Sequence, residues 1–201
     1  MASNDDGIPS VKVVLLGSTK VGKTSIVSML HSGEFFEDQS ATVGACFQVR
    51  KCKVDDQFLK LHIWDTAGQE KFRSLTPMYY RDSQFAVLVY AVDDEESFKE
   101  MRTWYSSLSQ DCAVMPRLVL VGNKTDLRAE DLGVVSTAQG EELARELGAE
   151  FYEVSAKTEH DNVVAIFDNI AAVAVKEVGV TAVTEFARNA KVAKNKKTCC
   201  A

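Results

Sequence analysis

The stretch GSTKVGKT, residues 17–24, constrains the fold more than any other feature of this 201-residue sequence. It comes directly after the apolar run VKVVLL at residues 11–16, which reads as a buried strand. The spacing G-x-x-x-x-G-K-[ST], between a strand and a helix, is typical of a loop whose backbone N–H groups surround phosphate oxygens. The sequence therefore predicts a strand–loop–helix unit that holds the phosphates of a nucleotide.

The residues of this phosphate loop have distinct expected roles. Lys23 should place its charge on the β- and γ-phosphates, and the hydroxyl of Thr24 should ligate Mg²⁺. The helix that follows adds the positive end of its dipole. The residues expected to bind the nucleotide here are Gly17, Ser18, Thr19, Lys20, Val21, Gly22, Lys23, Thr24 and Ser25. The loop alone does not indicate which base the nucleotide carries.

Short apolar runs alternate with helical patterns along the rest of the chain. Strands are predicted at residues 11–16, 47–54, 58–64, 84–92, 117–121 and 150–154. This alternation predicts an α/β fold of the P-loop NTPase type, with a mostly parallel six-stranded sheet and helices on both faces. Strands 47–54 and 58–64 are close enough in sequence to form a hairpin, which gives the sheet one antiparallel edge strand.

Two helices have clear signals in the second half of the chain. The first covers 136–148, with Ser136 or Thr137 as its N-cap and Gly148 at its end. The second covers 161–175 and places on one face Val163, Ile166, Phe167, Ile170 and Ala174. We expect both helices to pack on the sheet.

Composition and charge exclude several classes of protein. Five cysteines without CxxC spacing (Cys46, Cys52, Cys112, Cys199, Cys200) argue against a secreted disulfide scaffold and for a reducing compartment. We expect the first three to be small buried or half-buried side chains. No signal peptide is visible, and the longest apolar run, FAVLVYAV, is too short to span a bilayer.

The net charge of −6 is distributed unevenly. Residues 176–201 hold six Lys or Arg and two Glu, so this segment carries +4 and the remainder −10. An acidic body argues against a nucleic-acid partner. We therefore expect a flexible N-terminus (1–10), a nucleotide-binding domain (11–176), and a basic tail (177–201) with a partner of its own.

The segment WDTAGQE, residues 64–70, follows a predicted strand and indicates the chemistry. Open α/β sheets place ligands at the carboxyl ends of their strands, which is where Asp65 lies. Asp65 can support Mg²⁺ from the second shell, the N–H of Gly68 can approach a γ-phosphate, and Gln69 can orient a water molecule. The segment therefore predicts hydrolysis of the nucleotide.

Two further loops indicate the base. The stretch NKTD, residues 123–126, ends in Asp126, which can accept hydrogen bonds from N1 and N2 of guanine. Adenine lacks donors in that arrangement. The stretch SAK, Ser155, Ala156 and Lys157, follows the next strand and could pack around the purine. We therefore expect a guanine nucleotide.

The order GxxxxGK[ST], Thr42, DxxGQ, NKxD, SAK resembles the small GTPases of the Ras superfamily over residues 11 to about 175. Within that superfamily the segments KLHIWDTAGQEKF, YYR and VYAVDDEESF resemble Rab proteins. TVGACF and SLTPMYYR are most similar to the early-endosomal branch. The resemblance implies a G domain that cycles between GTP and GDP with Mg²⁺ as cofactor, and a role in vesicular, endosomal membrane traffic.

The resemblance also implies roles for single residues. Thr42 would ligate Mg²⁺ and contact the γ-phosphate, Phe35 would lie near the guanine, and the stem of Lys124 would cover one face of the base. Asn123 would brace the loops. The catalytic residues implied are Gln69, Lys23 and Thr42. Effectors would bind Phe47, Trp64 and Tyr79, although these three could also be core aromatics on strands.

The implied partners follow from the switch cycle. They are an exchange factor, a GTPase-activating protein, effectors, a GDP-dissociation inhibitor and the prenylation machinery. The protein would be a monomer on the cytoplasmic face of intracellular membranes, endosomal or vesicular, with a cytosolic pool. Thr19 and Lys20 stand where smaller residues are usual in this family, and Ala91 stands where Asp is frequent. These departures bear on the rate of hydrolysis more than on nucleotide binding.

Three other functions share part of this sequence pattern. A Ras- or Rho-type signalling GTPase usually has Cys fourth from its end, where this chain has Thr198. A non-hydrolysing scaffold that only holds GTP is disfavoured by Lys23, Thr24, Thr42 and Gln69. An ATP-using kinase is disfavoured by Asp126.

The tail sequence KNKKTCCA, residues 194–201, is typical of a lipid attachment site in this family. A zinc pair would need two further ligands nearby, and the tail has none. The resemblance implies geranylgeranyl groups on Cys199 and Cys200. Two lipid chains anchor a protein stably where one does not, and lysines add attraction to an anionic leaflet.

Overall fold

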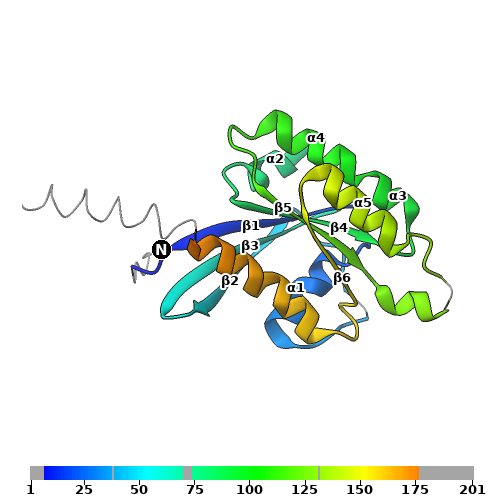
Figure 1. Ribbon diagram of the computed structural model, residues 1–201, viewed down its shortest axis with the longest axis horizontal. Helices are drawn as coiled ribbons and strands as arrows, with labels where there is room; N and C mark the ends of the chain where they lie inside the picture. Colours follow the sequence, from blue (N-terminus) through cyan, green and yellow to red (C-terminus); the bar gives the residue numbers. More distant parts are fainter. Residues whose placement is uncertain (1–6, 38, 70–73, 131, 177–201) are drawn as a thin grey trace, which may run out of the picture.

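Six strands form one mixed sheet in the order β2-β3-β1-β4-β5-β6 (Figure 1). The computed structural model describes residues 7–37, 39–69, 74–130 and 132–176. The strands are β1 (Ser10–Leu16), β2 (Ala45–Val54), β3 (Gln57–Thr66), β4 (Phe85–Ala91), β5 (Arg117–Asn123) and β6 (Glu150–Val154). β2 is antiparallel to β3, and every other neighbouring pair is parallel. The predicted mostly parallel sheet with one antiparallel edge strand is confirmed.

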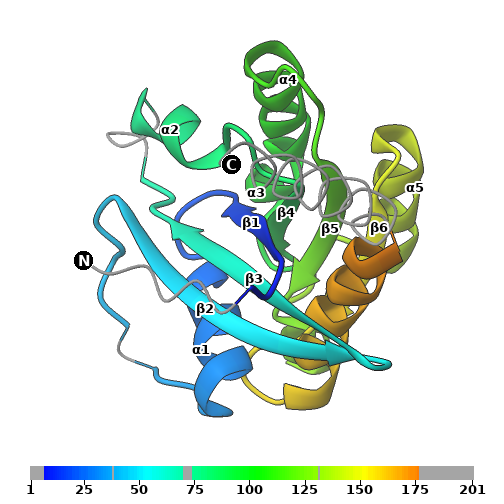
Figure 2. The same cartoon turned by 90° about the vertical axis from the view of Figure 1, so that its left-hand side faces the viewer.

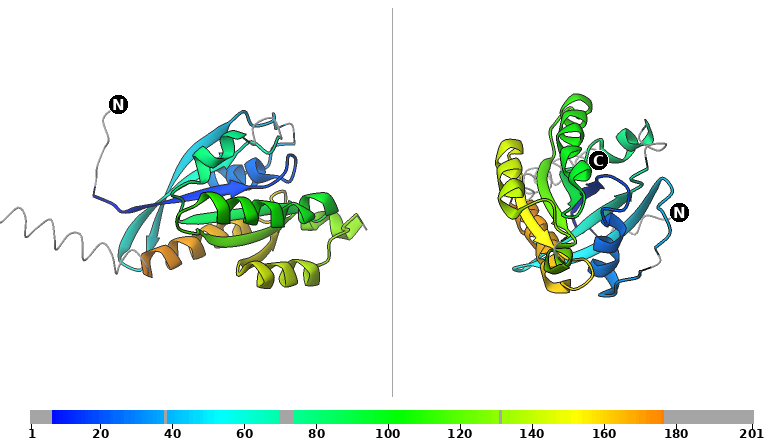
Figure 3. Two further views of the ribbon diagram at one scale, coloured as in Figure 1. Left: turned by 90° about the horizontal axis from the view of Figure 1, so that it is seen from above. Right: turned by 90° about the vertical axis from the view of Figure 1, so that its right-hand side faces the viewer.

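Helices cover both faces of this sheet (Figures 1 and 3). On one face lie α2 (Thr76–Tyr80), α3 (Glu95–Lys99), α4 (Met101–Asp111) and α5 (Thr137–Leu147). On the other face lie α1 (Lys23–Ser32) and an unlabelled helix over residues 160–176, orange in Figure 1. A short 3₁₀ helix, η2 (Thr125–Glu130), follows β5. The prediction of helices on both faces of the sheet is therefore confirmed.

The continuous apolar runs of the sequence are strands buried on both sides. In β1, Val13 and Leu15 pack toward α1 and the helix over 160–176, whereas Val14 and Leu16 pack toward α3, α4 and α5. All seven residues of β4 are buried. Burial on both faces is what parallel strands between two helical layers require, and it fixes the sheet as the rigid base of the site.

The two helices predicted in the second half of the chain form as expected. Ser136 caps α5 in a capping box with Gln139, and Gly148 ends the helix at φ +65°. In the helix over 160–176, the residues predicted to share one face are each at most 1% exposed: Val163, Ile166, Phe167, Ile170 and Ala174. Local caps and periodicity therefore suffice to define both helices.

The predicted hairpin is also present, and β2 lies at the outer edge of the sheet (Figure 2). Cys52 is buried and Cys112 half-buried, as expected. The prediction for Cys46 is wrong, because this thiol is exposed. β2 is an edge strand, and most of its side chains face solvent or are only partly covered.

Among the described residues, no helix has both the length and the apolar character that crossing a bilayer requires. The tail over 177–201, with Cys199 and Cys200, lies outside the described residues, as do residues 1–6. The first strand begins at Ser10, one residue before the predicted start of the nucleotide-binding domain.

Candidate nucleotide-binding site

The phosphate loop between β1 and α1 adopts a backbone that requires glycine at two positions. Gly17 has φ +146° and Gly22 has φ +95°. A Cβ atom on Gly17 would lie 2.2 Å from the carbonyl oxygen of Val89, and one on Gly22 would lie 2.2 Å from Nδ2 of Asn123. Lys20 also has a positive φ of 64°. The loop is therefore a strained, tightly curled segment.

Lys23 begins α1 and closes this loop from inside. Its Nζ donates hydrogen bonds to the carbonyl oxygens of Gly17 and Ser18, each at 2.7 Å. The residue is only 5% exposed. Burial lowers the pKa of its ammonium group to about 8, although the negative charges of Asp65 and Glu100 act in the opposite direction. The loop thus surrounds a buried amino group that is still charged at neutral pH.

Three oxygen-bearing side chains meet beside this loop, from α1, from the segment before β2 and from the end of β3. The hydroxyl of Thr24 lies 2.9 Å from the hydroxyl of Thr42 and donates to Oδ2 of Asp65 at 2.7 Å. Asp65 is 1% exposed, and burial raises its pKa, while the bond from Thr24 and the charge of Lys23 lower it. Oδ1 of Asp65 has no hydrogen-bond partner among the described residues.

This group of oxygens fits Mg²⁺, which prefers carboxylate and hydroxyl oxygens. A buried carboxylate oxygen without a hydrogen bond is costly unless a cation or water completes its surroundings. The structure therefore brings together the three residues that the sequence assigned to the metal.

Asn123, at the end of β5, joins the phosphate loop to the loop after β6. Its Nδ2 donates to the carbonyl oxygen of Val21 at 2.8 Å, and its Oδ1 accepts from the N–H of Ala156 at 3.0 Å. Asn123 is 1% exposed. Both groups of its amide are thus used in holding together loops that are far apart in sequence.

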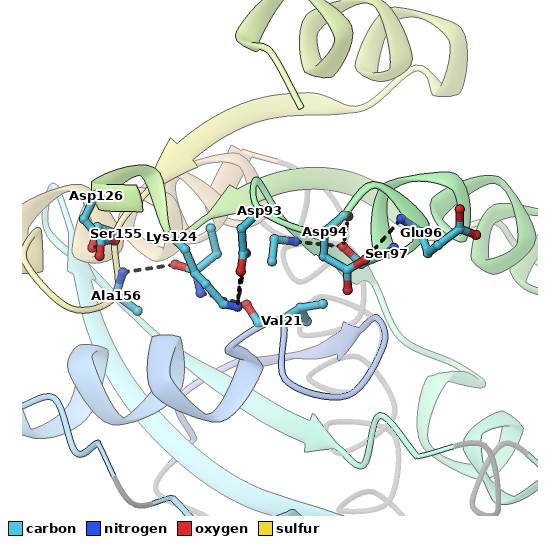
Figure 4. Close-up of polar contacts among 11 residues, drawn as sticks. Val21, Asp93, Asp94, Glu96, Ser97, Lys124, Asp126, Ser155 and Ala156 are labelled. Atoms are coloured by element: carbon cyan, nitrogen blue, oxygen red, sulfur yellow. Dashed lines mark hydrogen bonds and ion pairs between the residues drawn. The ribbon is translucent and has the colours of Figure 1, made fainter. Parts of the chain in front are cut away.

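The predicted base-binding residues gather at the same edge of the sheet (Figure 4). Ser155 donates from its hydroxyl to Oδ1 of Asp126 at 2.5 Å, which orients that carboxylate. On the other side of this region, Nζ of Lys157 lies 6.0 Å from the centre of the Phe35 ring. The structure therefore joins Asp126 to Ser155 and brings Lys157 close to Phe35.

Lys124 has a partner that sequence reasoning missed. Its backbone is left-handed, with φ +68°, and its Nζ lies 3.1 Å from a carboxylate oxygen of Asp93 (Figure 4). No role for Asp93 was predicted from the sequence. Asp94 does cap α3, accepting from the N–H groups of Glu96 and Ser97, but Asp93 belongs to the site. Asp93 stands among several adjacent acids, and nothing in the sequence distinguishes it from them as a partner of Lys124.

Gly68 and Gln69 lie beside the phosphate loop on the side of Thr19. A Cβ atom on Gly68 would lie 2.4 Å from the carbonyl oxygen of Ser18. Gly68, Gln69, Lys23, Thr24 and Thr42 line one open cavity of about 380 Å³. This cavity places Gln69 with the residues assigned to the phosphates and the metal.

A second missed residue is Glu100, which lies between α3 and α4. Its carboxylate accepts a hydrogen bond from the hydroxyl of Ser18 at 2.5 Å. The sequence offered no signal for it, because a single acid in a helical stretch is ordinarily a solvated side chain.

The three aromatic residues form a row of tilted rings at the surface. The rings of Phe47 and Trp64 are 5.1 Å apart, and those of Trp64 and Tyr79 are 5.7 Å apart. Phe47 is 47% exposed, and the other two are half-buried against the core. Of the two readings left open, the structure excludes a fully buried core cluster and leaves a surface that a partner could contact.

Comparisons with known proteins agree with this geometry. The model of the Ras family matches residues 12–176. The chain is 44% identical over 153 residues to the GTP-binding protein yptV2 of Volvox carteri, covering 76% of this chain and 69% of that protein. It is 39% identical over 180 residues to the GTP-binding protein ypt2 of Schizosaccharomyces pombe, covering 90% and 88%.

A third relative is the Ras-related protein Rab-5A of Dictyostelium discoideum, 40% identical over 169 residues, covering 84% of this chain and 83% of that protein. These identities are close to one another, so they do not single out the early-endosomal branch. The family itself is supported by the matched model, the coverage and the loop geometry together. The chain belongs to the Ras family and is, within it, a Rab-type small GTPase.

Proposed function

We propose that this protein is a GTP-hydrolysing switch that regulates vesicular membrane traffic. The observation that carries the proposal is the meeting of three loops and one strand end at one edge of the sheet. The phosphate loop, the end of β3 and the loops after β5 and β6 are joined there by Asn123 and Thr24. Ligands of open α/β sheets bind at this edge.

The phosphate loop would bind the β- and γ-phosphates. An ammonium group has three N–H donors, and the carbonyl oxygens of Gly17 and Ser18 take two from Lys23. The third donor is available to a phosphate oxygen. The backbone N–H groups of the loop and the N-terminus of α1 would complete the cradle.

Asp126 would select guanine. Its carboxylate can accept two hydrogen bonds from N1 and N2 of that base, and the bond from Ser155 restricts its orientation. The ring of Phe35 and the stems of Lys124 and Lys157 would cover the purine. A base with a different donor pattern would leave the carboxylate unpaired, which is costly in a partly buried site.

Thr24 and Thr42 would hold Mg²⁺, with Asp65 supporting the ion from the second shell, and the ion when bound neutralises negative charge on the phosphates. Gln69 would orient a water molecule in line with the γ-phosphorus. The new P–O bond forms as the bond to the β-γ bridging oxygen breaks, giving GDP and phosphate. Since positioning and electrostatics supply the catalysis, turnover without an activating protein should be slow.

Loss of the γ-phosphate would release Thr42 and Gly68, which gives the switch two states. Effectors would bind the GTP-bound protein at the surface formed by Phe47, Trp64 and Tyr79. The cycle would also need an exchange factor, a GTPase-activating protein and a GDP-dissociation inhibitor.

We also propose that Cys199 and Cys200 carry geranylgeranyl groups and attach the protein to an intracellular membrane, with an endosomal membrane as our specific expectation. The support is the paired cysteines beside Lys194, Lys196 and Lys197. Mass spectrometry of the native protein should find both thiols modified. Imaging should find a Cys199/Cys200→Ser variant in the cytosol, and compartment markers would test the endosomal assignment.

The decisive experiment is single-turnover hydrolysis of GTP by the purified full chain. The wild type should release phosphate slowly, and Gln69→Leu should release it at least tenfold more slowly while retaining GTP. Gln110→Leu is a matched control, because Gln110 is exposed on α4, away from the loop. Tight GTP binding without phosphate release, even with a Rab-activating protein, would favour a non-hydrolysing scaffold instead.

A further inference from the structure

Glu100 reaches the phosphate loop from a part of the fold that the motifs do not include. It lies at the junction of α3 and α4, where its own N–H donates to the carbonyl oxygen of Glu96 and its carbonyl oxygen accepts from the N–H of Trp104. The backbone is therefore held by the helices. The side chain does not cap α4. It turns instead to Ser18, 82 residues earlier in the chain.

We propose that Glu100 is a positioning residue that braces the phosphate loop through Ser18, an inference that rests on the proposed nucleotide site. The hydroxyl of Ser18 donates to Oε2 of Glu100 at 2.5 Å in a partly buried setting. A hydrogen bond to a carboxylate is shorter and roughly twice as strong as one between neutral groups. A single such bond can therefore fix the position of a loop residue.

Ser18 is the point of the loop at which this brace has most effect. Its carbonyl oxygen accepts one of the two bonds from Lys23. The same carbonyl oxygen is the atom that the Cα of Gly68 approaches so closely that no Cβ fits between them. Holding the side chain of Ser18 thus sets the place of the lysine and of the segment that carries Gln69.

The loop needs such braces because its backbone is strained. Lys20, which carries a side chain, has a positive φ of 64°, and unfavourable backbone of this kind persists only where surrounding contacts over-determine it. Lys23 holds the start of the loop and Asn123 holds Val21. Glu100 is the third attachment, and it reaches the loop from the face of α3 and α4.

Glu100 also borders the place where hydrolysis is proposed. A cavity of about 170 Å³ lies between the loop and α4, lined by Ser18, Thr19, Gly68, Gln69, Glu100 and Trp104, together with Ala67 and Thr76. The brace forms one wall of this cavity. A shift of Ser18 would therefore change both the phosphate cradle and the surroundings of Gln69.

Release of a fluorescent GDP from the full chain with Mg²⁺ present tests the brace. Ser18→Ala and Glu100→Ala should each speed release by about tenfold, the lower end expected for loss of a hydrogen bond to a charged group. The double variant should release GDP no faster than Glu100→Ala, because Ser18→Ala removes only a bond that Glu100→Ala has already removed. Glu96→Ala, whose exposed side chain pairs with Lys99, should stay within about twofold of wild type by the same comparison.

Two further variants separate the effect of side-chain length at position 100 from the effect of its negative charge. Glu100→Gln keeps an acceptor at the same distance but removes the charge, so its GDP release should lie between wild type and Glu100→Ala. Glu100→Asp keeps the charge but is one methylene shorter, so it should behave like Glu100→Ala. The opposite pattern, with Asp like wild type and Gln like Ala, would overturn the positioning role in favour of a general charge effect.

Other outcomes also decide the matter. Unchanged release in Ser18→Ala and Glu100→Ala, or single effects that multiply in the double variant, would refute the brace. A fall in thermal midpoint with unchanged release would reduce Glu100 to a residue of structural stability and refute it too. Wild-type protein that binds no guanine nucleotide would instead refute the proposed function, so the two failures are distinguishable.

Discussion

Nδ2 of Asn123 donates a hydrogen bond to the carbonyl oxygen of Val21 at 2.8 Å, across 102 residues of chain. This bond ties the end of β5 to the phosphate loop. The same side chain accepts from the backbone of the loop after β6. The part of the site that would hold the base and the part that would hold the phosphates are therefore fixed to each other by one buried amide.

Asn123→Ala should loosen both parts at once. It leaves the carbonyl oxygen of Val21 and the N–H of Ala156 without their partner in a buried place, so unfolding free energy should fall by about 1–3 kcal/mol. Release of GDP should be at least tenfold faster. Urea unfolding and stopped-flow fluorescence measure the two effects. Asn162→Ala, which removes an exposed amide bonded to Glu159, is the control and should change neither.

Gly68→Ala should separate hydrolysis from GDP binding. A Cβ atom at this position would meet the carbonyl group of Ser18 at 2.4 Å, so the segment must move away from the loop. We expect GDP affinity within a few-fold of wild type and phosphate release at least tenfold slower in single turnover.

Gly148→Ala is the matched control for this substitution. Gly148 differs from Gly68 in having a positive φ of 65°, and a Cβ atom there would meet nothing within 4 Å. It should cost about 1 kcal/mol of stability, through backbone strain alone, and leave hydrolysis unchanged. Equal losses of hydrolysis in the two variants would mean that the close approach of Gly68 to Ser18 has no catalytic importance.

Asp126→Asn should change the preferred base. An amide presents a donor where the carboxylate only accepts, which suits the O2 atom of xanthine better than the N2 amino group of guanine. We expect GDP affinity to fall at least tenfold and XDP affinity to rise, measured by competition against a fluorescent nucleotide. Asp161→Asn, an exposed carboxylate near the start of the helix over 160–176, should leave both affinities as they are. Unchanged GDP affinity in Asp126→Asn would contradict the guanine assignment.

Two buried tyrosines should respond to loss of their hydroxyl groups in opposite ways. The hydroxyl of Tyr90 has no hydrogen-bond partner among the described residues, and burial raises its pKa. The hydroxyl of Tyr80 donates to Asp111, and burial together with that carboxylate raises its pKa. Tyr90→Phe should stabilise the fold by up to about 1 kcal/mol, and Tyr80→Phe should destabilise it by about 0.5–1.5 kcal/mol.

Chemical denaturation followed by tryptophan fluorescence measures both tyrosine variants, with nucleotide-loaded protein in each case. Destabilisation of Tyr90→Phe by more than 1 kcal/mol would show that this hydroxyl is bonded and not merely enclosed.

Most of the fold could be predicted from the sequence, because its signals are local. The alternation of apolar runs, the capping box at Ser136 and the glycine at 148 each act within a few residues. The phosphate loop is likewise defined by its own spacing. The burial of Cys46 was mispredicted for the opposite reason, since its exposure depends on β2 being the edge strand of the assembled sheet.

The contacts that complete the site could not be predicted, because they join single residues far apart in the chain. Glu100 and Asp93 lie among several acids on or near α3, and nothing in their spacing distinguishes them from solvated neighbours. Only the packing of α3 and α4 beside β1 brings Glu100 to Ser18, and only the pairing of β4 with β5 brings Asp93 to Lys124.

The sequence by itself determined the family, the phosphate loop and the residues proposed for base and metal, because each is a short motif with its own spacing. The tertiary structure decided which side chains hold those motifs in place, Asn123 between two loops and Glu100 behind the phosphate loop. It also brought three aromatic rings together at the surface. The reason is physical. A motif depends only on neighbouring residues of the chain, whereas a hydrogen bond between distant residues forms only when the sheet brings the ends of its strands to one edge.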